Sequence, residues 1–128
     1  MKKLLILLVF VANSFAMDDL GPRHFKLAYK LQKPIVVYLY KDECKYCKAF
    51  QSSSLSNPLV SSLLKNEYIA TKINVGAVQS PFPFRITPTL VFIDHNAQAL
   101  AQSVEGNVDP ASLANYLENI ASEYKKIR

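Results

Sequence analysis

Two cysteines separated by two residues are the side chains of this sequence best suited to chemistry. They are Cys44 and Cys47, the only cysteines of the chain, and they enclose Lys45 and Tyr46. The motif follows an apolar run at residues 35–40 and opens a helical stretch. A thiol at a helix N-terminus faces unpaired N–H groups and the positive end of the helix dipole, which lowers its pKa and favours the thiolate.

This context predicts a redox-active dithiol in which the two cysteines have different roles. We expect Cys44 to be the exposed thiolate that attacks a substrate disulfide. We expect Cys47, one helical turn away, to be more covered and to resolve the mixed disulfide by attacking Cys44. No cofactor is expected, because the Cys44–Cys47 disulfide is itself the reactive group.

Two structural explanations of the motif remain as alternatives. One is a stabilising disulfide, although closing so short a loop removes little entropy from the unfolded chain. The other is half of a zinc site, whose further ligands would have to be His24 and His95, the only histidines. The pattern places these in a helix and in a turn, so we expect no metal and two ordinary surface histidines.

A proline at the start of a predicted strand marks a second candidate site. Thr87-Pro88 precedes the apolar run at 89–93, and a proline there forfeits no hydrogen bond that the strand needs. A cis peptide bond is the alternative, since it would turn the chain tightly and leave the Thr87 backbone free to pair with an extended substrate. Phe82 and Phe84 either form an apolar substrate groove beside Cys44 or pack the loop that contains them.

The elements that must position these residues alternate between helix and strand. Helix boundaries are signalled by Pro34, by Asn57-Pro58 and by Asp109-Pro110. The expected order is a helix around 25–31, a strand at 35–40, a helical stretch at 42–50, a helix from Pro58 to Leu64, a strand at 68–74, a loop at 75–87, a strand at 89–93, its hairpin partner at 99–105, and a final helix from Pro110 to Tyr124. This predicts a single α/β domain with a central mixed sheet flanked by helices, its crossover strands parallel and its final pair antiparallel.

Composition excludes several other classes of protein. The 128 residues suffice for one domain, and three glycines without a G-x-G-x-x-G or P-loop pattern exclude nucleotide chemistry on such loops. No apolar run reaches the roughly 18 residues of a transmembrane helix. The formal charge of +5 is scattered along the chain, so we expect a solvated surface and no nucleic-acid partner.

The first residues have the pattern of a secretory signal. Lys2 and Lys3 precede an apolar run at 4–12, and Ser14-Phe15-Ala16 supplies small residues where a signal peptidase cuts. We therefore expect residues 1–16 to be a signal peptide cleaved after Ala16 and residues 17–128 to be the mature domain.

In order and spacing, the segments around these motifs resemble the thioredoxin superfamily. The resemblance rests on residues 33–37 (KPIVV), the C-x-x-C motif, 70–75 (ATKINV), 86–92 (ITPTLVF) and Gly106, and it covers about residues 24–124. It is closest to the small exported thioredoxin-like proteins of bacteria, which are related to periplasmic disulfide reductases and isomerases. It implies a thioredoxin fold, Cys44 as nucleophile, Cys47 as resolving thiol, and Pro88 as a cis-proline facing them.

The resemblance also implies supporting roles for residues near the cysteines. Lys45 and Tyr46 lie between them, and Thr87 before the cis-proline and Tyr46 before the second cysteine are similar to the disulfide-isomerase branch. The sequence departs from cytosolic thioredoxins at Tyr38, which stands where they carry a buried acid, so the proton-relay role of that acid does not carry over. Lys72 matches the lysine that the family has behind its active site.

Together these observations predict a periplasmic thiol–disulfide oxidoreductase, a monomer that reduces or isomerises disulfides of exported proteins. The alternatives are a dithiol oxidase and a redox-inert binding or chaperone module with the same fold. Lys45 and Lys48 favour a nearby thiolate while Asp42 and Glu43 oppose them, so the charges leave the direction of electron flow open. Because the chain has no flavin or nicotinamide site, a reductase would be recharged by a membrane-embedded dithiol partner.

Overall fold

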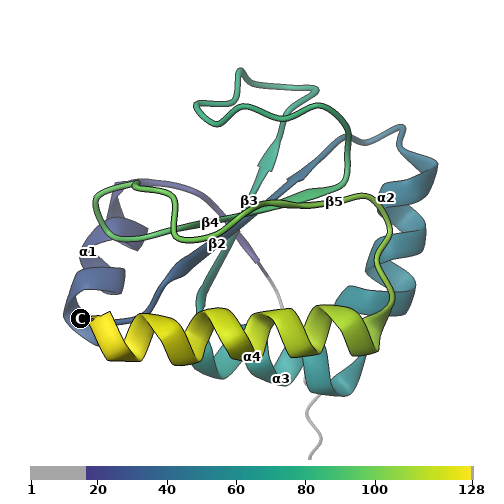
Figure 1. Cartoon of the computed structure of the whole chain (residues 1–128). Coiled ribbons are helices and arrows are strands. Elements are labelled where there is room, and N and C mark those ends of the chain that lie inside the picture. Colours follow the sequence, from purple (N-terminus) through teal and green to yellow (C-terminus); the bar gives the residue numbers. More distant parts are fainter. Residues whose placement is uncertain (1–16, 128) are drawn as a thin grey trace, which may run out of the picture.

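A five-stranded mixed sheet lies at the centre of the computed structural model, which describes residues 17–127 (Figure 1). In chain order the elements are β1 (Asp18–Asp19), α1 (Pro22–Leu31), β2 (Ile35–Tyr40), α2 (Lys45–Phe50), the π-helical segment η1 (Gln51–Leu55), α3 (Pro58–Glu67), β3 (Ile69–Asn74), β4 (Thr89–Ile93), β5 (Val104–Glu105) and α4 (Pro110–Ile127). The strand order is β1-β3-β2-β4-β5. β3 runs parallel to β1 and β2, whereas β4 is antiparallel to β2 and β5. The predicted α/β fold with a mixed sheet is confirmed.

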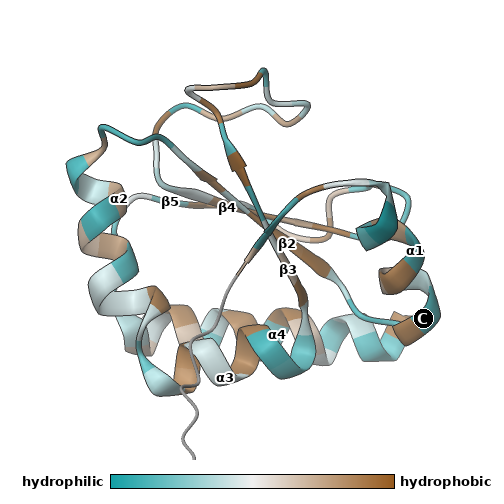
Figure 2. Ribbon diagram, turned by 180° about the vertical axis from the view of Figure 1, so that it is seen from behind, coloured by the Kyte–Doolittle hydropathy of each residue, from teal (hydrophilic) through white to brown (hydrophobic). Residues whose placement is uncertain are grey.

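The two faces of the sheet are covered differently. Because successive strand residues point to opposite sides, Val36 and Tyr38 of β2 face the cluster packed by α2, η1, α3 and α4. Ile35 and Val37 face the cluster packed by α1 and the loop at 75–88. In Figure 1, α3 and α4 lie together on one side of the sheet, and α1 and the loop lie on the other. Figure 2 shows apolar residues in the central strands and alternating apolar and polar stretches along the helices, as expected of helices with one buried face.

The helix boundaries signalled by proline and by capping residues are confirmed. Asn57 accepts hydrogen bonds from N–H groups in the first turn of α3, and Pro58 occupies its first position. The Asp109 carboxylate likewise accepts a hydrogen bond of 3.0 Å from the backbone N–H of Ser112. Both side chains satisfy donors that a helix leaves unpaired at its start.

The structure differs from the sequence prediction at two strands. The strand β1 was not predicted, because a two-residue strand of aspartates carries no hydropathy pattern. The hairpin partner expected at 99–105 is shorter: only Val104–Glu105 forms a strand, with an isolated bridge between Ile93 and Ala99. Residues 99–103 read Ala-Leu-Ala-Gln-Ser and contain no β-branched or aromatic side chain, the types that favour strand pairing.

The predicted signal segment, residues 1–16, lies outside the described residues, so its cleavage stays a prediction. Within residues 17–127, no helix has both the length and the apolar character needed to cross a bilayer.

Candidate active site

Cys44 lies just beyond the carboxyl end of β2, the middle strand of the sheet, and is the N-cap residue of α2. Its backbone is extended (φ −133°, ψ 101°), and its sulfur accepts a hydrogen bond of 3.1 Å from the backbone N–H of Cys47. The sulfur thus takes the place of the side-chain oxygen that caps most helices. Negative charge that develops on Cys44 Sγ during thiol exchange is stabilised by this N–H and by the helix dipole.

Cys44 and Cys47 form a disulfide with their sulfurs 2.14 Å apart. Cys44 is partly exposed, whereas Cys47 is only 1% exposed. An external thiol or disulfide can therefore reach Cys44 but not Cys47. The burial agrees with the exposures expected from the sequence, while the roles of nucleophile and resolving thiol stay predictions.

The loop before β4 brings Thr87 against the outer sulfur. The Thr87–Pro88 peptide bond is cis. The Thr87 hydroxyl oxygen lies 3.3 Å from Cys44 Sγ, and the hydroxyl is the donor because a disulfide sulfur carries no hydrogen. The Thr87 carbonyl oxygen lies 3.7 Å from the same sulfur. Pro88 is buried, and its carbonyl accepts a hydrogen bond of 2.9 Å from Gly106, which links the turn to the end of β5.

Lys45 and Tyr46, predicted as supporting residues, are both exposed at the start of α2. The Lys45 ammonium lies 5.5 Å from the centroid of the Tyr46 ring, which is 59% exposed. Ile86, the residue before Thr87, is 45% exposed. Tyr46 and Ile86 therefore present apolar surface from the two segments that meet at Cys44. The sequence assigned no surface role to Ile86, although this residue opens the segment 86–92 that carries the family resemblance.

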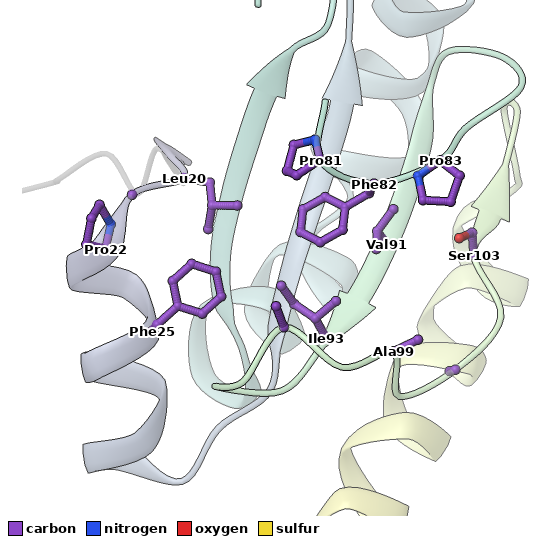
Figure 3. Close-up of a pocket in the computed structure, with 13 residues that line it drawn as sticks. Leu20, Pro22, Phe25, Pro81, Phe82, Pro83, Val91, Ile93, Ala99 and Ser103 are labelled. Carbon is purple, nitrogen blue, oxygen red and sulfur yellow. The ribbon is translucent and has the colours of Figure 1, made fainter. Parts of the chain in front are cut away.

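Phe82 and Phe84 pack the loop that contains them, which is one of the two arrangements expected from the sequence. Both are partly buried and pack against the apolar cluster on the α1 face of the sheet. Phe82 lines a pocket of about 750 Å³ with Val91 and Ile93, as Figure 3 shows, and the residues lining this pocket do not include Cys44. The structure thus supports loop packing rather than a substrate groove. The physical reason is that the loop at 75–88, rather than a helix, covers the apolar side chains of β4 on this face.

Tyr38 of β2 lies beneath α2 and is 3% exposed. Its hydroxyl accepts a hydrogen bond of 3.0 Å from Gln51 Nε2 and donates a long one, 3.4 Å, to the carbonyl oxygen of Cys47. Burial raises the pKa of this hydroxyl above its usual value, so it is neutral at physiological pH. Where the family resemblance implies a buried acid, this chain has a neutral hydrogen-bonded phenol.

The Tyr38 ring continues into an aromatic stack. Its centroid lies 5.3 Å from that of Tyr40, and the Lys72 ammonium lies 5.8 Å from the Tyr40 centroid. Among the residues that the structure describes, Lys72 forms no ion pair. Lys72 lines a second pocket together with Tyr38, Tyr40 and Gln51.

His24 belongs to α1 and His95 packs against Tyr29 of α1, and α1 lies at the end of the molecule opposite α2 (Figure 1). His24, in the first turn of α1, is 2% exposed and not a surface residue as expected, and its Nδ1 accepts a 3.0 Å hydrogen bond from the Gly21 N–H. The His95 ring lies 4.9 Å from that of Tyr29. Over residues 17–127, no cluster of three or more histidine, cysteine or acidic side chains could hold a metal ion.

Comparison with known proteins agrees with this arrangement. A family model described as a thioredoxin-like domain matches residues 22–121. A thioredoxin from Thermus thermophilus superposes with a TM-score of 0.71 at 21% identity, covering 87% of this chain and 91% of that chain. The oxidised C-terminal domain of DsbD from Neisseria meningitidis superposes with a TM-score of 0.66 at 19% identity, covering 81% of this chain and 98% of that chain.

A third similar structure is a DsbH oxidoreductase, with a TM-score of 0.59 and 17% identity over 95% of both chains. A search of curated protein sequences gave no match. At these identities the solved structures show the fold, and the family model spans most of the chain. The protein therefore belongs to the thioredoxin-like domain family.

Proposed function

We propose that this protein is a thiol–disulfide oxidoreductase that reduces or isomerises disulfide bonds of exported proteins in the periplasm. The observation that carries the proposal is the unequal exposure of the Cys44–Cys47 disulfide at the start of α2. The outer sulfur can be attacked from solvent, and the inner sulfur is held beside it, out of reach of other thiols. A dithiol with this arrangement completes exchange within the protein.

In the reducing direction, the Cys44 thiolate attacks one sulfur of a substrate disulfide. A bond forms between Cys44 and that sulfur, the substrate disulfide breaks, and its other sulfur leaves as a thiolate that takes up a proton. Cys47 then loses its proton and attacks Cys44, which restores the Cys44–Cys47 disulfide and releases the second substrate thiol. Two electrons pass from the dithiol to the substrate.

The surface around Cys44 supports a protein substrate in extended form. The hydroxyl and the carbonyl of Thr87 lie beside the reactive sulfur, where the backbone of an extended chain can be aligned. The exposed side chains of Tyr46 and Ile86 would bury apolar surface on either side of the substrate cysteine.

The signal-like residues 1–16 support the periplasmic location, and with it the need for an electron source there. An exported reductase of this kind would receive two electrons from a membrane-embedded dithiol partner after each turnover. If the protein instead works as an oxidase, the same disulfide would be restored by an oxidant.

Trapping tests the proposal directly. The Cys47→Ala variant should accumulate mixed disulfides on Cys44 with exported proteins, and Cys44→Ser should accumulate none, because only Cys44 is accessible. Absence of adducts on Cys47→Ala would contradict the enzymatic function and favour a binding module. The reduction potential, measured against glutathione, then gives the direction: a value nearer about −270 mV supports a reductase, and one near about −120 mV supports an oxidase.

A further inference from the structure

The hydroxyl of Tyr38 joins the middle strand of the sheet to the first turns of α2. It lies 3.4 Å from the carbonyl oxygen of Cys47 and 3.0 Å from Nε2 of Gln51. Because Cys47 and Gln51 are four residues apart, they lie one above the other on the same face of a helix. That face is the one turned toward Tyr38.

The direction of the two hydrogen bonds is determined by the chemistry of the partners. The Gln51 amide nitrogen is a donor only, so the phenol oxygen accepts from it. The carbonyl of Cys47 is an acceptor only, so the phenol proton points to Cys47. Gln51, whose side chain reaches in from an exposed position, thus orients the Tyr38 hydroxyl toward the backbone of the buried cysteine.

We propose that Tyr38, oriented by Gln51, is a positioning residue for the resolving step, holding the first turn of α2 against β2 so that Cys47 Sγ stays directed at Cys44. The inference rests on the proposed function. According to this inference, the two steps of thiol–disulfide exchange depend on different contacts. Attack by Cys44 depends on contacts with Thr87 and with the helix N-terminus. Attack of Cys47 on the mixed disulfide depends on the hydrogen bond between the Tyr38 hydroxyl and the Cys47 carbonyl oxygen beneath α2.

The chain provides a matched control in Tyr68. This tyrosine is 2% exposed, and its hydroxyl donates a 2.6 Å hydrogen bond to the carbonyl oxygen of Leu117 in α4, away from the disulfide. Tyr68→Phe and Tyr38→Phe therefore each remove a hydroxyl group from a buried ring, and in each case that hydroxyl is hydrogen-bonded to a carbonyl oxygen of a helix. Any general effect of losing such a hydroxyl on the folded state should appear in both variants.

The experiment follows the reaction of the reduced protein with oxidised glutathione, quenched at successive times and analysed by mass spectrometry. The first rate is formation of the glutathione adduct on Cys44, and the second is its conversion to the Cys44–Cys47 disulfide. We expect Tyr38→Phe to leave the first rate within about twofold and to slow the second by roughly three- to tenfold, because a small misplacement of the attacking sulfur slows an intramolecular step. Tyr68→Phe should change neither rate.

Gln51→Ala provides a second variant on an exposed residue, where folding is not at risk. It should slow resolution by about twofold, because the Tyr38 hydroxyl keeps its bond to Cys47 but loses its orienting donor. Equal resolution rates in wild type, Tyr38→Phe and Gln51→Ala would overturn the inference, and so would equal slowing in Tyr38→Phe and Tyr68→Phe. If wild type forms no adduct at all, the proposed function fails and the inference falls with it.

Discussion

The two faces of the sheet hold their covering elements by different means. On the face covered by α2, η1 and α4, side-chain hydroxyls donate hydrogen bonds to backbone carbonyl oxygens of other segments. These bonds run from Tyr38 to Cys47, from Tyr68 to Leu117 and from Ser54 to Val108. On the opposite face, α1 and the loop at 75–88 pack through an apolar cluster that leaves a pocket of about 750 Å³. Apolar contacts are non-directional, whereas hydrogen bonds set an orientation. The comparison shows that directional contacts between elements lie on the face that α2, η1 and α4 cover, and that one of them, from Tyr38, reaches a cysteine of the disulfide.

The largest expected effect is a difference in disulfide-exchange activity between a variant at Cys44 and a variant on the α1 face of the sheet. Cys44→Ser should reduce disulfide exchange to background, since the accessible sulfur is lost, whereas Phe82→Ala should leave the exchange rate with glutathione within about twofold. Quenched thiol–disulfide exchange assays with glutathione measure the rate for both variants. A large loss of activity in folded Phe82→Ala would favour the substrate groove that the sequence left as an alternative, and would contradict the distinction between the faces.

The next effect is a difference in how much a core substitution on each face lowers the free energy of unfolding. Phe92 of β4 is fully buried on the helix-covered face, so Phe92→Ala should lower the free energy of unfolding by about 3–5 kcal/mol. Phe82 already borders an open pocket and is partly exposed, so Phe82→Ala should have a smaller effect, about 1–2 kcal/mol. Urea denaturation of the two variants compares them, and equal losses would show that both faces are packed alike.

A smaller effect concerns the surface beside Cys44. Tyr46→Ala and Ile86→Ala should each lower kcat/KM for a protein disulfide by roughly three- to tenfold while leaving exchange with glutathione unchanged, because only the larger substrate buries these side chains. Parallel kinetics with both substrates test this. Equal losses for the two substrates would indicate that these residues affect the disulfide itself.

The smallest effect is a dependence of stability on pH at the start of α4. A hydrogen bond from the Ser112 backbone N–H lowers the pKa of Asp109 below its usual value of 3.8. A carboxylate with a lowered pKa stabilises the fold above its unfolded pKa, and this contribution is lost as pH falls through the folded value. Asp109→Ala should therefore melt a few degrees below wild type at pH 7, with the gap narrowing as the pH falls below 4. Thermal unfolding across this pH range measures the gap, and a constant gap would refute the role of the carboxylate.

Prediction succeeded where short-range chemistry decides the structure. α1 ends before Pro34, at Leu31, and Asn57 and Asp109 cap their helices through contacts within three residues. It was wrong where distant partners decide. β1 exists because Asp18 and Asp19 pair with β3, and His24 is buried by the packing of α1 rather than by its own hydrophobicity.

The candidate site divides in the same way. By itself, the sequence determined that Cys44 and Cys47 stand one turn apart at a helix start, because spacing and a preceding strand are local properties. Only the tertiary structure decided that Thr87 meets Cys44 across 43 residues, that Tyr38 lies under Cys47, and that Phe82 turns to the α1 face. Such contacts depend on which face of the sheet each strand residue occupies and on what covers that face, and both are settled only when the whole core packs.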